Sequence, residues 1–171
     1  YERTSVRQFT DQTLTQEQID AILKAGFCAP SARNFQPWYF VVIEKESLIR
    51  QLQGFSPYAS PLQTATLAIV VCADLSINPS TDYCQQDCAA ATQNMLVQAK
   101  ELGIGSCWMG GYPNQDRIEK IKEIIDLPEH ILPLWILAFG IPNQNPPVKD
   151  KWNEEVVDKI NPDDLYVKAN F

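Results

Sequence analysis

The sequence contains a single histidine, His130, among its 171 residues. A Ser-His-Asp or Cys-His device would depend on that one side chain, and no G-x-S-x-G nucleophile motif accompanies it. His130 stands beside a Pro-Glu turn in L-P-E-H-I-L-P, which favours a loop position with its polar edge in water over a catalytic role. The scarcity of histidine therefore argues against a hydrolase.

Paired cysteines and phosphate-binding glycine loops are also missing. The five cysteines form no Cys-x-x-Cys pair, and Cys84 and Cys88 have no nearby histidine, so packing is favoured over a zinc site. We expect no metal, and we expect reduced thiols and a cytoplasmic location. No G-x-x-x-x-G-K-[ST] loop occurs, and Trp108 takes the place of the third glycine that a G-x-G-x-x-G motif would need.

Positive charge and long apolar runs are scarce as well. The chain has 14 Lys+Arg against 21 Asp+Glu, which leaves no basic face for a nucleic-acid partner. Its longest apolar run, Leu67 to Ala73, is far shorter than the roughly 20 residues that cross a bilayer, so no membrane partner is expected. With 45% hydrophobic and 20% charged residues, residues 1–171 have the composition of one globular domain.

Hydrophobic periodicity predicts helices alternating with strands. Thr15 and Gln18 form a capping box, which predicts a first helix over about 16–28. A charged amphipathic helix is expected at about 115–125. The β-branched and apolar runs predict strands at 38–44, 67–73, 106–110 and 134–140. This alternation indicates an α/β or α+β layered domain.

The strongest helix pattern starts at an Asp cap near residue 82 and ends at Gly103. Its buried stripe is expected to contain Cys84, Cys88, Ala91 and Met95. Small residues keep the neighbouring surface open to close approach by another backbone: Ala89, Ala90 and Thr92. We interpret this as the central helix. The proline-rich stretch that follows the last strand predicts an extended arm, residues 142–171.

Three segments are polar or glycine-rich where strands and helices meet: E-R-T-S-V-R-Q-F (2–9), A-P-S-A-R-N-F-Q-P-W (29–38) and S-C-W-M-G-G-Y (106–112). Such junctions commonly bind ligands. The first two contain three of the five arginines, although surface positions would explain each arginine taken alone. Turns beside a strand explain Gly103 and Gly105, whereas Gly110 and Gly111 indicate bare backbone that a flat ligand could approach.

Together these segments resemble the nitroreductase family of FMN-dependent oxidoreductases. R-T-S-V-R is similar to the family's R-x-S-[VI]-R, A-P-S-A-R-N-F-Q-P-W to its A-P-S-x-x-N-x-Q-P-W, and G-I-G-S-C-W-M-G-G to its flavin-side strand and turn. D-C-A-A-A-T-Q-N and P-E-H-I-L-P also resemble family members. The resemblance implies an α+β fold, a three-layer α/β/α sandwich with a mixed central sheet, in a domain-swapped homodimer.

The resemblance also implies how FMN phosphate is held. Arg3 and Ser5 would bind the phosphate, and Thr4 would lie beside the phosphate-ribityl chain. Arginine suits this role because it presents a rigid fork of charged donors. Many family members carry K-x-R in the carboxy-terminal arm, whereas this chain has K-D-K. Lys149 and Lys151 are therefore expected as phosphate contacts that lack the bidentate geometry of arginine.

For the flavin ring, the resemblance implies that Arg7 faces the pyrimidine edge, where positive charge favours two-electron reduction. Trp38 is expected in the core. Four residues would reach the flavin from the other subunit: Pro30, Ser31, Ala32 and Asn34. Four others would line the ring, with the two glycine N–H groups near N5 and O4: Trp108, Met109, Gly110 and Gly111.

The implied activity is ping-pong transfer of two electrons from NADH or NADPH, through FMN N5, to nitroaromatics, quinones or free flavins, without a catalytic side chain. One alternative is a non-catalytic FMN-binding or storage protein, which would need the same contacts. Another is a thiol-based redox protein that uses Cys84 and Cys88.

Overall fold

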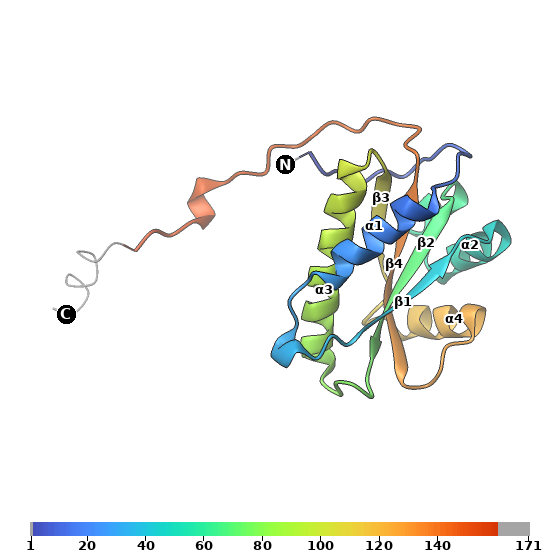
Figure 1. Cartoon of the computed structure of the whole chain (residues 1–171), viewed down its shortest axis with the longest axis vertical. Coiled ribbons are helices and arrows are strands. Elements are labelled where there is room, and N and C mark those ends of the chain that lie inside the picture. The colour runs from blue at the N-terminus through green and yellow to red at the C-terminus, as the bar shows by residue number, and fades with distance from the viewer. Residues whose placement is uncertain (1, 161–171) are drawn as a thin grey trace.

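The computed structural model describes residues 2–160 and contains a four-stranded sheet in the order β1-β2-β4-β3 (Figure 1). The strands are β1 (Trp38–Ile43), β2 (Leu67–Asp74), β3 (Gly105–Gly110) and β4 (Ile131–Gly140). All four predicted strands are confirmed, although β4 begins three residues earlier than expected. The two central strands are almost wholly buried, as their apolar sequences require.

All three strand pairings in this sheet are antiparallel, which corrects the expectation of a mixed sheet. Ile43 pairs with Ala68, so the connection from β1 to β2 leaves and re-enters the sheet at the same end. The helix in that connection therefore does not act as a crossover between parallel neighbours. Within residues 2–160 the only parallel pairing is an isolated bridge between Ser5 and Ser106.

Helices cover both faces of the sheet. Helices α1 (Gln16–Phe27) and α3 (Thr81–Glu101) pack on one face, and α2 (Glu46–Leu52) and α4 (Gln115–Ile125) on the other (Figure 1). The side chains of β2 alternate between the two cores, as the period of a strand dictates. Helix α2 was not predicted, because seven residues are too few to reveal a helical period.

The capping box at the start of α1 is confirmed: the Thr15 hydroxyl accepts from the Gln18 N–H, and the Gln18 side chain accepts from the Thr15 N–H. Helix α3 instead begins after Ser80, and Asp82 lies within its first turn, which corrects the expected Asp cap. The predicted α3 stripe is fully buried. Thr92 is buried too, because Trp135 Nε1–H donates to its hydroxyl at 2.8 Å, so this residue serves the chain's own core.

Proline 133 lies inside the central strand β4. The register with β2 shifts between Val71 and Cys72, so Leu134 has no partner in β2. The Leu134 carbonyl instead accepts from the amides of Gly111 at 3.0 Å and Tyr112 at 2.7 Å. This bulge allows a proline, which has no N–H, to sit in a central strand, and it fixes the turn that ends β3.

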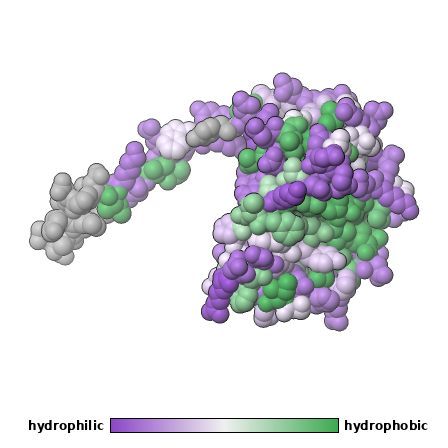
Figure 2. Space-filling model, viewed as in Figure 1, coloured by the Kyte–Doolittle hydropathy of each residue, from purple (hydrophilic) through white to green (hydrophobic). Residues whose placement is uncertain are grey.

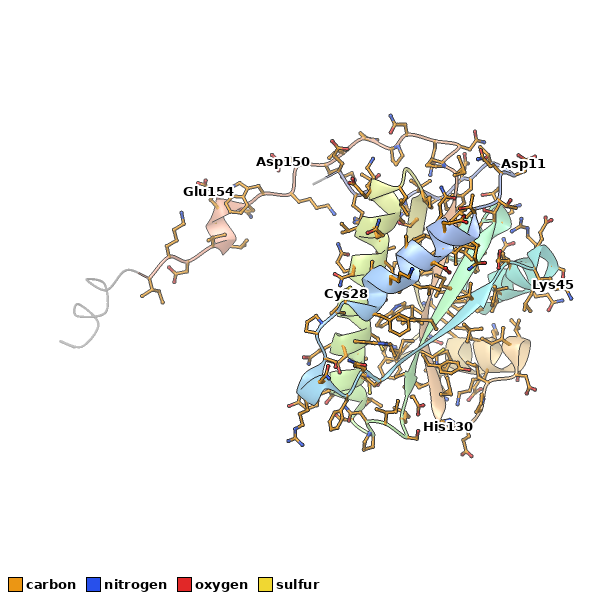
Figure 3. All side chains as sticks on the ribbon, viewed as in Figure 1. Asp11, Cys28, Lys45, His130, Asp150 and Glu154 are labelled. Atoms are coloured by element: carbon orange, nitrogen blue, oxygen red, sulfur yellow. The ribbon has the colours of Figure 1, made fainter. Side chains whose placement is uncertain are left out.

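After β4 the chain runs as an extended arm that projects from the body, with one short 3₁₀ turn at Glu154–Val156 (Figure 1). The predicted arm also includes residues 161–171, which lie outside the described residues. His130 is exposed in the turn before β4, as expected (Figure 3). No helix among residues 2–160 is long and apolar enough to cross a membrane.

Candidate functional site

The amino-terminal segment lies along the open edge of β3. Ser5 bridges to Ser106, and the Val6 N–H donates to the Ser106 carbonyl at 2.9 Å. A Cβ on Gly105 would lie only 2.8 Å from a Val6 methyl carbon, so this approach requires glycine. Gly103, with φ +73°, is a turn residue as expected, whereas Gly105 is explained by close packing inside the strand.

A hollow of about 1000 Å³ between α3 and the arm brings three predicted phosphate contacts together. Arg3, Lys149 and Lys151 all line it. Asp150 is the one carboxylate among the lining residues, so the charge of the hollow is positive. The remaining wall consists of Gln93, Val97, Val148 and Trp152. Figure 2 shows the arm standing clear of the body, with open space between them.

A second cavity, of about 360 Å³, lies at the end of β3 and brings predicted ring contacts together. Arg7, Trp108, Met109 and Gly110 line it. Gly110 is exposed, and a Cβ there would meet nothing within 4 Å, so its backbone faces open space. The other lining residues are Cys107 from β3, Ser56, Pro57, Tyr58 and Ser60 from the segment after α2, and Arg117 from α4.

Positive charge also dominates this second cavity. Arg117 Nη1 donates to the Gly110 carbonyl at 2.9 Å, and its guanidinium carbon lies 5.6 Å from the centre of the Tyr58 ring. Burial raises the pKa of the Cys107 thiol, and the charges of Arg7 and Arg3 partly oppose that rise. Both predicted arginines therefore carry positive charge near the Cys107 thiol.

Two predicted contacts lie elsewhere. Thr4 lines a separate hollow of about 70 Å³ together with Lys100 and Gly103. Gly111 is buried, and a Cβ there would lie 3.0 Å from the Leu134 carbonyl oxygen that its own N–H bonds. The Gly111 amide is therefore committed to the β4 bulge. Within the described residues Gly110 lines the cavity and Gly111 does not.

Four predicted contacts lie in a loop at the other end of α3 from the amino-terminal segment: Pro30, Ser31, Ala32 and Asn34 (Figure 1). The Ala32 N–H donates at 2.9 Å to Asp87 Oδ1, and Asp87 is buried. The other Asp87 oxygen has no hydrogen-bond partner within residues 2–160. One copy of the chain does not bring this loop to the cavity that Arg7 lines.

Comparison with known proteins identifies the family of this chain. The model of the nitroreductase family matches residues 1–61 and 57–141. A candidate NADH dehydrogenase/NAD(P)H nitroreductase of Archaeoglobus fulgidus is 38% identical over 167 residues, which cover 97% of this chain and 93% of that protein. The chain belongs to the nitroreductase family.

Solved structures of nitroreductases share the whole fold. The structure of a candidate NADH dehydrogenase/NAD(P)H nitroreductase from Parabacteroides distasonis has a TM-score of 0.88 at 34% identity, and the match covers 94% of each chain. An FMN-dependent nitroreductase from Clostridium difficile has a TM-score of 0.87 at 27% identity, covering 94% of this chain and 96% of that one.

The structure adds site residues that the nitroreductase motifs did not identify. The sequence could have indicated Arg117, because it is an arginine in the first turn of a helix that follows the Gly-Gly turn. No sequence pattern indicated Tyr58, because it lies among short 3₁₀ turns that have no hydrophobic period. Asp87 stands within a quoted family motif, but its bond to Ala32 joins positions 55 residues apart.

Three further cysteines are buried in the two cores, Cys84 and Cys88 in one and Cys72 in the other. Burial raises the pKa values of Cys72, Cys84 and Cys88, and the neighbouring charge of Asp87 adds to the rise for Cys84. Buried thiols that stay protonated are poor nucleophiles. Their surroundings favour packing over a thiol-based reaction in this nitroreductase.

Proposed function

We propose that this chain is an FMN-dependent oxidoreductase that NADH or NADPH reduces and that passes two electrons to nitroaromatics, quinones or free flavins in alternating half-reactions. The observation that carries the proposal is the pair of positive sites to which the amino-terminal segment contributes: Arg3 and two lysines line one, and Arg7 and Gly110 line the other. Family membership supports it, as does similarity to a protein that is named an FMN-dependent nitroreductase.

The charged side chains that line the first hollow suit a phosphate group. Arg3 supplies a planar fork of donors, and Lys149 and Lys151 supply two further charges from the arm. Each charge-assisted hydrogen bond contributes roughly 1.5–3 kcal/mol. Ser5 follows Arg3 by two residues and is bridged to Ser106 of β3, and we propose its hydroxyl as a further donor.

The second cavity fits a flat ring. When bound, FMN would accept a hydride at N5 and pass two electrons to the next substrate. Arg7 would stabilise negative charge at the pyrimidine edge, and the bare backbone of Gly110 would face the ring. Trp108 is 36% exposed and would bound the ring, whereas Met109 is buried and shapes the wall by packing from beneath.

A second copy of the chain would complete the site. The Pro30–Asn34 loop lies away from both hollows in one copy, so we propose that it reaches the ring of the partner in a homodimer. Figure 2 shows apolar surface across the face formed by α1, α3 and β1. Large apolar side chains of α1, of α3 and of the loop after α1 are exposed: Phe27, Phe35, Tyr83 and Val97. We propose that this face and the arm form the dimer contact.

The domain and its location complete the proposal. We propose that residues 1–171 form one domain with an extended arm, residues 142–171, whose tail from Lys151 to Phe171 wraps the partner. All five cysteines are free thiols, which supports work in a reducing compartment, the cytoplasm. Light scattering should report a dimer with FMN bound, and a monomer that retains FMN would remove the dimer from the proposal.

Anaerobic mixing of the purified yellow protein with NADH or NADPH tests the activity. We expect the absorbance of oxidised flavin to disappear within seconds to minutes and to return on addition of a nitroaromatic or a quinone. If the colour persists, the protein binds or stores FMN without turnover. If Cys84→Ser with Cys88→Ser abolishes hydride transfer, the thiol alternative gains support instead. A colourless protein that does not take up FMN would end the proposal.

A further inference from the structure

The cavity at the end of β3 has an unusual charge for this protein. The chain carries a net charge of -7, yet the ten residues that line the cavity include Arg7 and Arg117 and no carboxylate. The two ion pairs found within residues 2–160 involve Arg50 and Lys100, so neither cavity arginine is neutralised by a carboxylate partner. Two guanidinium groups in one small cavity repel each other, and a bound anion would relieve that repulsion.

Arg117 is the cation of this cavity that the proposed cofactor does not use. Arg7 is assigned to the ring edge, whereas Arg117 belongs to α4 and also lines the cavity. One N–H of Arg117 bonds the Gly110 carbonyl, and its guanidinium group lies over the Tyr58 ring. These two contacts hold the group in place, and an arginine has five N–H donors, so several stay available to a ligand.

The position of Arg117 on its helix adds to the positive potential. Asn114 caps α4 by accepting from the Arg117 N–H at 3.1 Å, so Arg117 lies in the first turn, where the helix dipole favours anions. Asp116 lies in the same turn and opposes this field, but it is not among the residues that line the cavity. The side chains that face the cavity therefore present positive charge.

We propose that Arg117, supported by Tyr58, is a specificity-determining residue that selects substrates carrying an anionic group. That group is a carboxylate on the electron acceptor or a phosphate on the nicotinamide reductant. The inference rests on the proposed function, because alternating half-reactions place acceptor and reductant in the same cavity in turn. The anion would lie against Arg117 and Tyr58 while the reacting group faces the flavin ring that Gly110 would contact.

A matched pair of acceptors tests the first source of the anion. 4-Nitrobenzoate and 4-nitrobenzamide have the same nitro group and similar shape, and they differ in charge. Arg117→Gln keeps an N–H donor for the Gly110 carbonyl and removes the charge. We expect it to raise KM for the benzoate roughly tenfold, as one lost charged contact would, and to leave KM for the amide within about twofold. Arg117→Lys should restore part of the difference.

The control is Lys120→Gln, which removes one charge from an exposed position on the same helix outside the cavity. It should leave both KM values unchanged. The wild-type preference for the benzoate should also shrink as ionic strength rises, because added salt screens a charge contact. FMN content and melting temperature of Arg117→Gln should match the wild type, which excludes loss of cofactor or of folding as the cause.

A second experiment measures kcat/KM for NADPH and NADH in the same variants. A roughly tenfold loss for NADPH alone would assign the anion to the 2′-phosphate, and an equal loss for both would assign it to the pyrophosphate. If KM for the nitro compounds and kcat/KM for the nicotinamides are all unchanged at full FMN content, the inference is overturned. Equilibrium dialysis of the two nitro compounds needs no turnover, so it tests the role of Arg117 even if the reductase activity is absent.

Discussion

The amino-terminal segment and the Pro30–Gln36 loop both supply predicted flavin contacts, yet the fold holds them by opposite means. The segment lies along β3 with its backbone paired to Ser106 and Val6 packed on Gly105. The loop leaves α1 and is tied to α3 by one side-chain bond, from Ala32 to Asp87. Three of its residues adopt left-handed backbone angles, with φ values of 52–57°.

This difference indicates how the proposed site is divided between two copies of the chain. The segment is built into the sheet of its own chain, so the positions of its two arginines follow from strand pairing. The loop lies at the other end of α3, and the left-handed conformations of Arg33 and Gln36 cost about 1 kcal/mol or more each. A strained loop beside exposed aromatic side chains is suited to contact another copy of the chain.

The largest expected effect comes from forcing the segment off the sheet. A Cβ in Gly105→Ala would lie 2.8–2.9 Å from two Val6 carbons, so we expect a loss of about 2–3 kcal/mol and a fall of roughly 5–10 °C in Tm. FMN affinity should fall with it. The control is Gly54→Ala, where a Cβ would meet nothing within 4 Å. An unchanged Tm for Gly105→Ala would show that the segment is not held against β3.

The next effect isolates the charge that the segment carries. Arg3→Ala should weaken FMN binding roughly ten- to a hundredfold, the scale of one lost charged contact, with little change in Tm because Arg3 lines an open hollow. A flavin fluorescence titration measures this. Lys120→Ala, at an exposed position on α4, removes the same charge elsewhere and should leave the affinity unchanged. Equal affinities for Arg3→Ala and the wild type would place the phosphate elsewhere.

A smaller effect is expected at Asp87, which accepts the hydrogen bond that joins the loop to α3. Asp87→Ala leaves the Ala32 N–H without its partner, so we expect a loss of about 1–2 kcal/mol in chemical unfolding. Asp87→Asn keeps an acceptor oxygen and should lose less. If the loop serves the partner's ring, Asp87→Ala should also weaken FMN binding and dimerisation together. Weaker FMN binding without any change in dimerisation would contradict a contact made across subunits.

The smallest effect tests the strain in the loop. Arg33 has φ 53°, which glycine adopts freely, so Arg33→Gly relieves strain while it adds freedom to the unfolded chain. We expect these terms to leave a gain of at most about 0.5 kcal/mol, measured as a small rise in Tm. A loss above about 1 kcal/mol would instead show that the Arg33 side chain makes a stabilising contact.

Much of the architecture was predictable because local patterns decided it. The capping box fixed the start of α1, and apolar β-branched runs marked the strands. Helix α2 was missed for its brevity. The start of β4 was missed because Pro133 argues against a central strand, and the bulge at Leu134 that accommodates it depends on pairing with β2.

The candidate site was predictable in its parts and not in its assembly. The motifs identified Arg3, Arg7 and Gly110, whose residue types suit a phosphate and a flat ring. Gly111 shows the limit of prediction from motifs, because its N–H donates to the carbonyl of Leu134, a residue 23 positions later in the chain. Arg117 and Tyr58 belong to no motif, and they meet only because the segment after α2 and the start of α4 pack at the same end of β3.

By itself, the sequence determined which segments become helices and strands. It also determined that three of the five arginines lie where helices and strands meet. Helix caps, hydrophobic periods and residue chemistry decide these features, because they act over a few neighbouring positions. The tertiary structure decided that the sheet is antiparallel, that Gly105 admits Val6, and that two arginines share a cavity without a carboxylate. These outcomes depend on backbone pairing and side-chain packing between residues that are distant along the chain, which no local pattern records.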